Sequence, residues 1–74
     1  MLTDSVFQAI EYGATEQQVF ERIGPPYRKA RFPATATTAW DYHYRDAWGY
    51  DSDFSVIFDD AGVVTGKFSV RDSG

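Results

Sequence analysis

The sequence predicts an α+β domain in which two short helices precede an antiparallel β-meander of three strands, or of four with one further edge strand. Two observations support this prediction: apolar residues recur at helical spacing up to Ile23, and from Tyr27 onward they alternate with polar residues. Because the helical segments come first and short turns join the strands, we expect the helices to pack on one face of the sheet. The whole chain, residues 1–74, is expected to form this single domain.

The first predicted helix spans about residues 4–12. Apolar residues at helical spacing between Val6 and Ile10 form a stripe along it. Thr3 or Asp4 can cap its start by accepting a hydrogen bond from an unpaired backbone amide, and Gly13 lies where the helix is expected to end. A helix this short gains its stability from packing on the sheet.

The second predicted helix spans about residues 15–23 and has clearer end signals. Thr15 and Gln18 have the spacing of a capping box, in which each side chain bonds the backbone amide of the other residue. Gly24 suits the position after a helix, and the Pro25–Pro26 pair prevents the helix from continuing.

Three strands are predicted at about residues 38–46, 53–59 and 63–70, and a short edge strand at 28–32 is left open. Large apolar and polar residues alternate in the first two, which is typical of strands with one buried and one solvated face. Asp59–Gly62 has the composition of a tight turn, so the last two strands should form a hairpin. The residues expected to point into the core from the last strand are Val64, Phe68 and Val70.

The composition narrows the classes of function. The 74 residues have a formal net charge of −4, 18% aromatic residues and no cysteine. Binding to nucleic acid needs clustered Lys and Arg to neutralise phosphates, so the acidic balance argues against a nucleic-acid partner. Without cysteine there is neither a disulfide nor a thiolate metal site, and no apolar run reaches the roughly 20 residues of a membrane span.

Catalytic and metal-binding interpretations find little support in the residues. His43 is the only histidine in the sequence, and it stands on the polar side of its strand without a nucleophile motif. Asp51, Asp53, Asp59 and Asp60 lack the spacing, the central glycine and the closing glutamate of a calcium-binding loop. We therefore expect no catalytic residue, no metal ligand and no cofactor, and a small enzyme or metal binder is the weakest hypothesis.

One face of the sheet is expected to remain free of the helices, and we interpret it as the partner-binding surface. Interfaces favour Tyr, Trp and Arg as anchors, and the loop after the first long strand carries two aromatic residues with little reason to serve the core. A solvated face without a partner is the competing interpretation. The predicted partner-binding residues are Asp41, His43, Arg45, Trp48, Tyr50, Ile57 and Lys67, with Ser55 and Ser69 expected on the same face.

Three motifs follow one another along the chain. Gly13–Val19 with Ile23–Pro26 has the form G-x-T-x-x-x-V…hG-x-P, where h is apolar. Trp40–Tyr44 has the form W-x-Y-x-[YF], and Val56–Val64 has the form V-x-F-x-x-x-G-h-V. Each motif alone is common, but their order and spacing resemble the SmpA/OmlA (BamE-like) family over the range Leu2–Val70.

The resemblance implies a fold similar to that of a β-lactamase inhibitor protein and a location on the periplasmic side of the bacterial outer membrane. Members of the family are typically lipoproteins, and the best-understood one is an accessory subunit of the machinery that inserts β-barrel proteins. Neither a signal peptide nor a lipid-bearing cysteine lies in this segment, so the lipid anchor is expected in the full-length protein. The loop at Trp48–Tyr50 looks more like that of uncharacterised short relatives than like that of the assembly subunit.

The leading hypothesis is a non-catalytic periplasmic interaction module of an outer-membrane lipoprotein, which contributes to outer-membrane protein assembly or envelope integrity. Its expected partners are envelope proteins, among them the β-barrel assembly machinery, or anionic lipid headgroups. The alternative is an inhibitor-like domain that binds a hydrolase through the open sheet face. Short connections between the elements also leave open a homodimer formed by exchange of an element.

Overall fold

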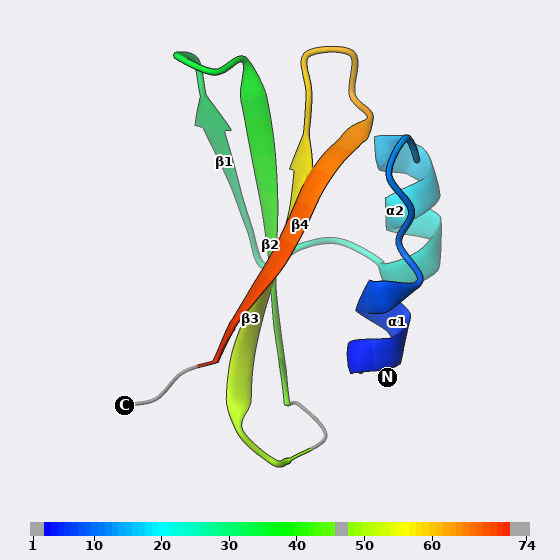
Figure 1. The fold of residues 1–74 in the computed structure, drawn as a ribbon, viewed down its shortest axis with the longest axis vertical. Coiled ribbons are helices and arrows are strands. Elements are labelled where there is room, and N and C mark those ends of the chain that lie inside the picture. The colour runs from blue at the N-terminus through cyan, green and yellow to red at the C-terminus, as the bar shows by residue number, and fades with distance from the viewer. Residues whose placement is uncertain (1–2, 46–47, 72–74) are drawn as a thin grey trace.

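The computed structural model describes residues 3–45 and 48–71, which form two helices followed by four strands (Figure 1). The strands form one antiparallel sheet in the order β1-β2-β3-β4, so each pairs with its neighbours in sequence. The predicted α+β class and the antiparallel meander are confirmed, and the edge strand left open by the sequence is present as β1. The elements are α1 (Asp4–Gln8), α2 (Glu16–Ile23), β1 (Arg28–Phe32), β2 (Thr37–Arg45), β3 (Asp51–Phe58) and β4 (Val64–Arg71).

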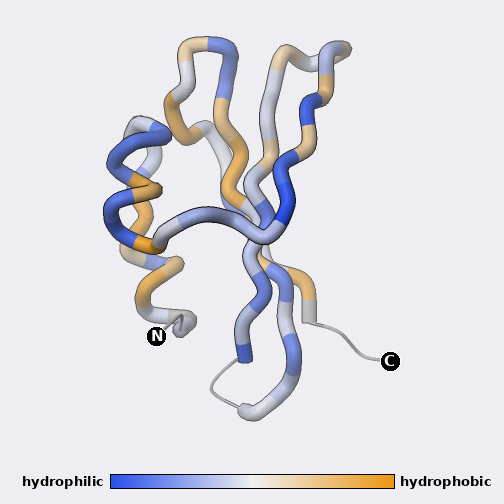
Figure 2. Tube along the Cα trace, turned by 180° about the vertical axis from the view of Figure 1, so that it is seen from behind, coloured by the Kyte–Doolittle hydropathy of each residue, from blue (hydrophilic) through white to orange (hydrophobic). Residues whose placement is uncertain are grey.

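A hydrophobic core joins the helices to the sheet. Figure 1 shows α1 and α2 on the same side of the strands, and Figure 2 shows hydrophobic and hydrophilic residues interspersed along both helices. The ring of Phe7 stacks on that of Phe54 with centroids 4.1 Å apart and also contacts the rings of Tyr42 and Tyr44. Since aromatic rings bury large apolar areas, these contacts stabilise a helix too short to persist alone. The buried core residues are Phe7, Ile10, Val19, Ile23, Trp40, Tyr42, Phe54, Val56, Phe58 and Val64.

Helix α1 ends at Gln8 rather than near residue 12, which corrects the predicted length. Beyond it the chain runs to the edge of β4. There the N–H of Gly13 donates to the carbonyl of Val64, and the N–H of Val64 donates to the carbonyl of Ala14, both at 2.8 Å. An amide that bonds the sheet cannot also bond a helical carbonyl, so pairing with β4 ends the helix. Gly13 has a positive φ of 88° but does not cap α1.

Side-chain caps start both helices. The Thr3 hydroxyl accepts a hydrogen bond from the N–H of Val6 at 3.3 Å, so Thr3 is the N-cap of α1. At α2 the predicted capping box is present. Thr15 Oγ1 accepts from the N–H of Gln18 at 3.1 Å, and Gln18 Oε1 accepts from the N–H of Thr15 at 2.9 Å. Gly24 then ends the helix with a φ of 81°, which residues with a Cβ adopt only under strain.

A β-bulge lies near the start of β4. Phe58 of β3 pairs with Val64, whereas the preceding residue, Ile57, pairs with Gly66. Thr65 is therefore an extra residue on β4, and the inward–outward alternation shifts by one position beyond it.

The bulge reverses the predicted orientation of the rest of β4. Phe68 pairs with Ser55 and Val70 with Asp53, and the two apolar side chains are 52% and 55% exposed. The prediction that Phe68 and Val70 point into the core is therefore wrong. It assumed an unbroken alternation from Val64, which is itself buried.

The buried phenol of Tyr42 makes the stability of the fold depend on pH in the alkaline range. Tyr42 is 1% exposed, and its hydroxyl donates to the carbonyl of Gly24 at 2.8 Å. Burial raises the pKa of Tyr42 from 10.0 to about 12, so the folded state holds the phenol proton more tightly than the unfolded chain does. This stabilisation is complete below pH 10.0 and is lost as the pH rises towards about 12.

We therefore expect the free energy of unfolding of the wild type to fall above pH 10.0. Urea titrations at a series of alkaline pH values measure this fall, and Tyr42→Phe, which has no phenol to ionise, should show a smaller one. Equal losses in the two proteins would show that Tyr42 does not carry the linkage.

Candidate interaction surface

The face of the sheet opposite the helices, which we call the outer face, carries the candidate site. The register pairs Asp41 with Ser55, His43 with Asp53 and Ser55 with Phe68. Because residues directly opposite one another in a sheet point to the same side, these side chains share the outer face. The predicted binding residues that the register places on it are Asp41, His43, Arg45 and Ile57.

Asp41, which was predicted as a surface residue, is only 7% exposed and accepts three side-chain hydrogen bonds. Nε and Nη2 of Arg28 donate to its Oδ2 at 3.0 and 2.8 Å, and Ser55 Oγ donates to its Oδ1 at 2.6 Å. The hydrogen bond to Asp41 raises the pKa of Arg28, so the guanidinium stays charged. Asp41 thus ties β1, β2 and β3 together, and a carboxylate this buried does not fit its predicted role as a partner contact.

His43 remains exposed but is held from two sides. Its ring stacks on that of Tyr27, with centroids 3.8 Å apart and an angle of 16° between the planes. Its Nδ1 contacts a carboxylate oxygen of Asp53, and the guanidinium carbon of Arg28 lies 5.7 Å from the centroid of the Tyr27 ring. These contacts order a row of planar polar and aromatic groups, the kind of pre-positioned surface that protein interfaces use.

The other predicted residues near the β2–β3 connection are also exposed. Arg45 Nη2 lies 3.6 Å from Asp51 Oδ1, a loose pair between two exposed side chains. Trp48 and Tyr50 are 78% and 53% exposed, so neither ring belongs to the buried core. Position 46, the predicted end of this strand, lies outside the described residues.

Lys67 does not lie on the outer face, which corrects another prediction. It pairs with the core residue Val56, and Ser69 pairs with the core residue Phe54, so both lie on the side of the sheet that faces the helices. The Lys67 ammonium donates to the backbone carbonyls of Gln8 at 3.0 Å and Ile10 at 2.5 Å. Carbonyls at a helix C-terminus lack helical partners and carry partial negative charge, so Lys67 stabilises the end of α1 instead of meeting a partner.

The outer face also carries apolar and aromatic residues that the sequence prediction missed. Phe68, Val70 and Tyr27 are each about half exposed, at 52%, 55% and 48%. Phe68 and Val70 lie opposite Ser55 and Asp53 of β3, and Tyr27 stacks on His43 of β2. A Cβ at Gly66 would lie 3.6 Å from the Cβ of Ile57, so the glycine packs beside it on this face. A glycine inside a predicted strand is a signal of a bulge, and it offered a way to find the shifted alternation.

The outward position of Phe68 has a direct test. Phe68→Thr is expected to lower the free energy of unfolding by less than about 1 kcal/mol, because the ring is half exposed. An inward phenylalanine would cost about 3–5 kcal/mol on truncation. Val64→Ala, at a position that is 2% exposed, provides the buried comparison, with an expected loss of about 2 kcal/mol. Urea denaturation of the three proteins gives the values, and a larger loss for Phe68→Thr than for Val64→Ala would contradict the bulged register.

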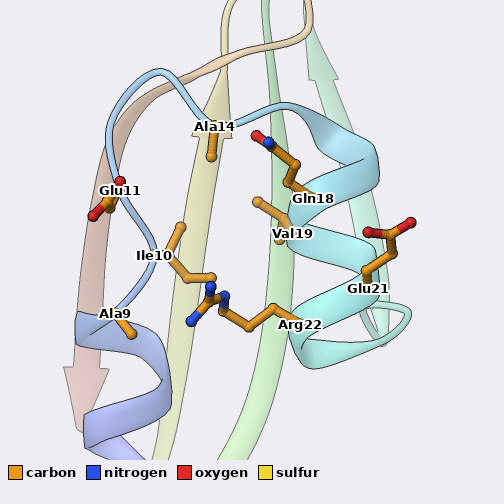
Figure 3. A pocket seen from close by; sticks show the side chains of 8 residues that line it. All are labelled: Ala9, Ile10, Glu11, Ala14, Gln18, Val19, Glu21 and Arg22. Carbon is orange, nitrogen blue, oxygen red and sulfur yellow. The ribbon is translucent and has the colours of Figure 1, made fainter.

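A hollow lies on the helix side of the molecule, between α2 and the segment that follows α1. It has a volume of about 650 Å³, and Figure 3 shows the Arg22 side chain reaching across it towards Ile10. Its lining mixes acidic, amide and small apolar side chains, with no convergent set of polar groups that would define a reaction. Over the described ranges, 3–45 and 48–71, no group of three or more His, Asp or Glu side chains is placed to hold a metal ion.

Comparison with known proteins identifies the family of this chain. The sequence matches the family model for the outer membrane protein assembly factor BamE domain over residues 1–67. No curated protein sequence matches the chain significantly. A crystal structure titled as a putative osmotically inducible lipoprotein OsmE has a similar fold, with a TM-score of 0.76 at 23% identity. That match covers 89% of this chain and 75% of the other. The family suggested by the three sequence motifs is thus confirmed, and the chain belongs to the BamE domain family.

Proposed function

We propose that this chain is the periplasmic domain of an outer-membrane lipoprotein, and that it acts without catalysis by contacting other envelope proteins through the outer face of its sheet. Its contribution is to outer-membrane protein assembly or to envelope integrity. The name of the matched family and the lipoprotein with the similar fold support this role. No helix in the described part of the chain is long and apolar enough to cross a membrane.

The observation that supports the outer face most is its exposed apolar and aromatic area. Phe68, Val70 and Tyr27 stay half exposed there although the same sheet buries a full core on its other side. Beside them lies the ordered His43–Asp53 pair. Half-exposed aromatic residues among paired charges match the composition of non-obligate protein interfaces. The matched family points to envelope proteins, including the β-barrel assembly machinery, as the proposed partners, and anionic lipid headgroups are the competing class.

The inhibitor-like alternative uses the same outer face and the proposed likeness to a β-lactamase inhibitor protein. It predicts a one-to-one complex with a hydrolase and loss of that enzyme's activity. Assays against envelope hydrolases separate it from the assembly role, because an assembly module has no reason to inhibit them.

The test of the proposed function uses the full-length lipoprotein, expressed in a strain that lacks its own copy. The wild type is expected to restore the outer-membrane barrier, measured as resistance to a detergent and to a large antibiotic. The double variant Phe68→Thr/Val70→Thr is expected to fail, since it removes the exposed apolar side chains while placing threonine, which favours strands, at both positions. Gln17→Ala on the exposed side of α2 is the matched control and should restore the barrier fully.

Each outcome bears on a separate part of the proposal. A folded double variant that restores the barrier as well as the wild type contradicts the outer face as the binding surface. A barrier that does not depend on the protein at all contradicts the envelope role itself. Circular dichroism of the purified variants establishes that they are folded.

A further inference from the structure

We propose that the open edge of β1 binds an acidic, extended segment of another envelope protein, which pairs with it as an additional strand of the sheet. The inference rests on the proposed interaction role and assigns a second surface to it, the edge of β1, which adjoins the outer face at Tyr27. Three features of β1 support it together. Its outer edge pairs with no described strand, it carries three positively charged side chains, and an exposed aromatic ring lies at each of its ends.

The outer edge of β1 is available for pairing. In the sheet order β1-β2-β3-β4, β1 has β2 as its neighbour on one side and no described strand on the other. Every second residue of an edge strand directs its backbone N–H and C=O away from the sheet, which is a template for a further strand. The strand Arg28–Phe32 contains no proline or bulge that would prevent such pairing.

The opposite edge of the sheet differs, because the chain itself covers part of it. The segment after α1 bonds Val64 of β4 through Gly13 and Ala14, and Thr15 forms a bridge with Val63. No segment among the described residues does the same for β1. The two edges are therefore not equivalent, and β1 is the one whose outer edge pairs with no strand along its whole length among residues 3–45 and 48–71.

Positive charge is concentrated on this edge. Three of the chain's seven lysine and arginine residues, Arg28, Lys29 and Arg31, lie in β1, although the chain as a whole carries a net charge of −4. Figure 2 shows the strongly hydrophilic stretch that they form along the edge of the sheet. Successive residues of a strand point to opposite faces, so an incoming strand meets cations on both of its faces. Glutamate or aspartate on that strand would gain favourable cross-strand pairs.

The cationic side chains are held in place before any partner binds. Arg28 is bonded to Asp41 through Nε and Nη2 while its side chain stays 66% exposed, and its Nη1 takes part in neither bond. Lys29 Nζ lies 4.7 Å from the centroid of the Trp40 ring. Positions fixed in advance reduce the entropy lost on binding.

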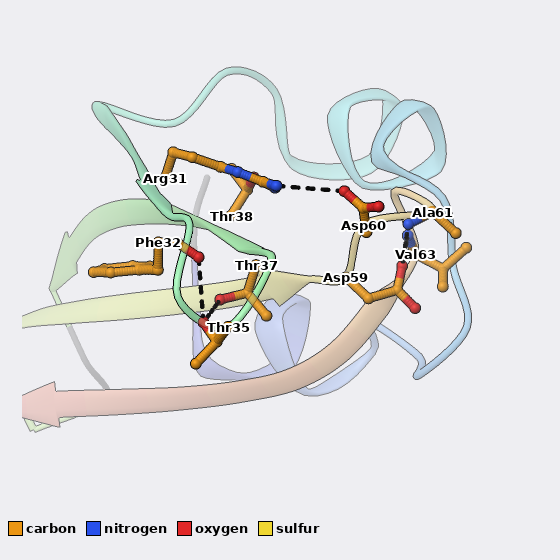
Figure 4. A network of polar contacts seen from close by, with 9 residues as sticks. All are labelled: Arg31, Phe32, Thr35, Thr37, Thr38, Asp59, Asp60, Ala61 and Val63. Carbon is orange, nitrogen blue, oxygen red and sulfur yellow. Dashed lines mark hydrogen bonds and ion pairs between the residues drawn. The ribbon is translucent and has the colours of Figure 1, made fainter.

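The third cation, Arg31, is held by a residue of β2 and by a residue of the turn between β3 and β4. Its Nη1 donates to Thr38 Oγ1 at 3.2 Å, and its Nη2 donates to Asp60 Oδ1 at 3.3 Å (Figure 4). Both side chains of the Arg31–Asp60 pair are well exposed, so the pair is weak and a carboxylate of the partner can share the guanidinium.

Aromatic rings flank the strand at both ends. Tyr27 and Phe32 are 48% and 49% exposed, and each offers apolar area to a residue of the incoming segment. Half-exposed aromatic rings are the common anchors of protein interfaces, since they bury a large area on contact at little entropic cost.

A second copy of β1 fits this edge poorly. Antiparallel pairing of two β1 strands about Ala30 would place Lys29 of each copy opposite Arg31 of the other. Like charges directly opposite one another are destabilising, and edge-strand charges of this kind protect proteins from self-association. The charges therefore disfavour a second copy and favour an acidic partner strand.

The test uses the purified chain and a blocked peptide of about six residues in which glutamate alternates with valine. Fluorescence anisotropy measures binding, and amide hydrogen exchange locates it. We expect the peptide to bind and to slow the exchange of alternate β1 amides. The double variant Lys29→Gln/Arg31→Gln is expected to bind about tenfold more weakly or worse. Arg22→Gln removes a positive charge from α2 and, as the matched control, should bind like the wild type.

Peptide controls separate strand pairing from simple charge attraction. Two peptides are compared, one N-methylated at its odd-numbered residues and the other at its even-numbered residues. Each lacks the amide donors along one edge, so one peptide should lose binding and the other should keep it. Equal binding of both N-methylated peptides overturns the proposal, as does equal binding of an analogue with lysine in place of glutamate.

Two further results would overturn the choice of partner. One is binding to vesicles that contain an anionic phospholipid without binding to the acidic peptide. The other is self-association of the wild type in sedimentation that the double variant loses. The two proposals can fail separately. If the peptide does not bind, the edge-pairing proposal is overturned, and the complementation result for the outer face still stands. If complementation fails while the peptide binds, only the proposed function is contradicted.

Discussion

Phe7→Ala is expected to lower the free energy of unfolding by about 3–5 kcal/mol, the largest effect of any single substitution considered for this chain. The Phe7 side chain is fully buried, and its ring contacts three aromatic rings of the sheet. Truncation removes the buried area and leaves a cavity between α1 and the sheet, which the rigid rings around it cannot close. Urea denaturation followed by circular dichroism measures the loss.

Two companion variants make this result interpretable. Phe7→Leu keeps most of the buried volume and should lose less than half as much stability, so it remains folded if Phe7→Ala does not. Phe20→Ala, on α2, removes a ring that is 51% exposed and should cost less than about 1 kcal/mol. Equal losses at Phe7 and Phe20 would contradict the role given to Phe7 in joining α1 to the sheet.

Asp41→Ala has the second-largest expected effect, a loss of about 2–3 kcal/mol in the free energy of unfolding. The substitution removes both hydrogen bonds from Arg28 and leaves the hydroxyl of Ser55, which is 8% exposed, without its acceptor. A buried polar group without a partner costs more than the lost bond itself. Thermal and urea unfolding both measure the change.

The neighbouring carboxylate provides the control for Asp41. Asp53 contacts His43, but the two side chains are 45% and 63% exposed, so Asp53→Ala should cost less than about 1 kcal/mol. A double-mutant cycle with Arg28→Ala should show coupling between Arg28 and Asp41. Asp41→Ala with no more effect than Asp53→Ala would show that Asp41 is a surface residue after all.

Local signals predicted the parts of the fold whose causes are local. The capping box of Thr15 and Gln18 and the stop at Gly24 set the ends of α2, and all three act within a few residues of sequence. Hydrophobic alternation likewise predicted the antiparallel strands. The end of α1 differs because the chain after it bonds to a residue far away in the sequence, with the N–H of Gly13 donating to the carbonyl of Val64.

The candidate site was predicted less completely, because its composition depends on pairing between strands. One extra residue, Thr65, exchanges the faces of Lys67 and Phe68, and no alternation counted along β4 alone shows this. Asp41 stands in the polar phase of its strand as expected, yet Arg28 and Ser55 from neighbouring strands bury it. His43 and Arg45 needed no such information and are on the outer face as expected.

The most direct test of the central claim, that the outer face contacts another envelope protein, is photo-crosslinking from single positions of the full-length lipoprotein in intact cells. Probes at Phe68 and Val70 sample the outer face, and a probe at Gln17 samples the exposed side of α2. We predict that Phe68 and Val70 crosslink to one and the same envelope protein and that Gln17 does not. Crosslinking to that protein from Gln17 alone, or equally from all three positions, would contradict the claim.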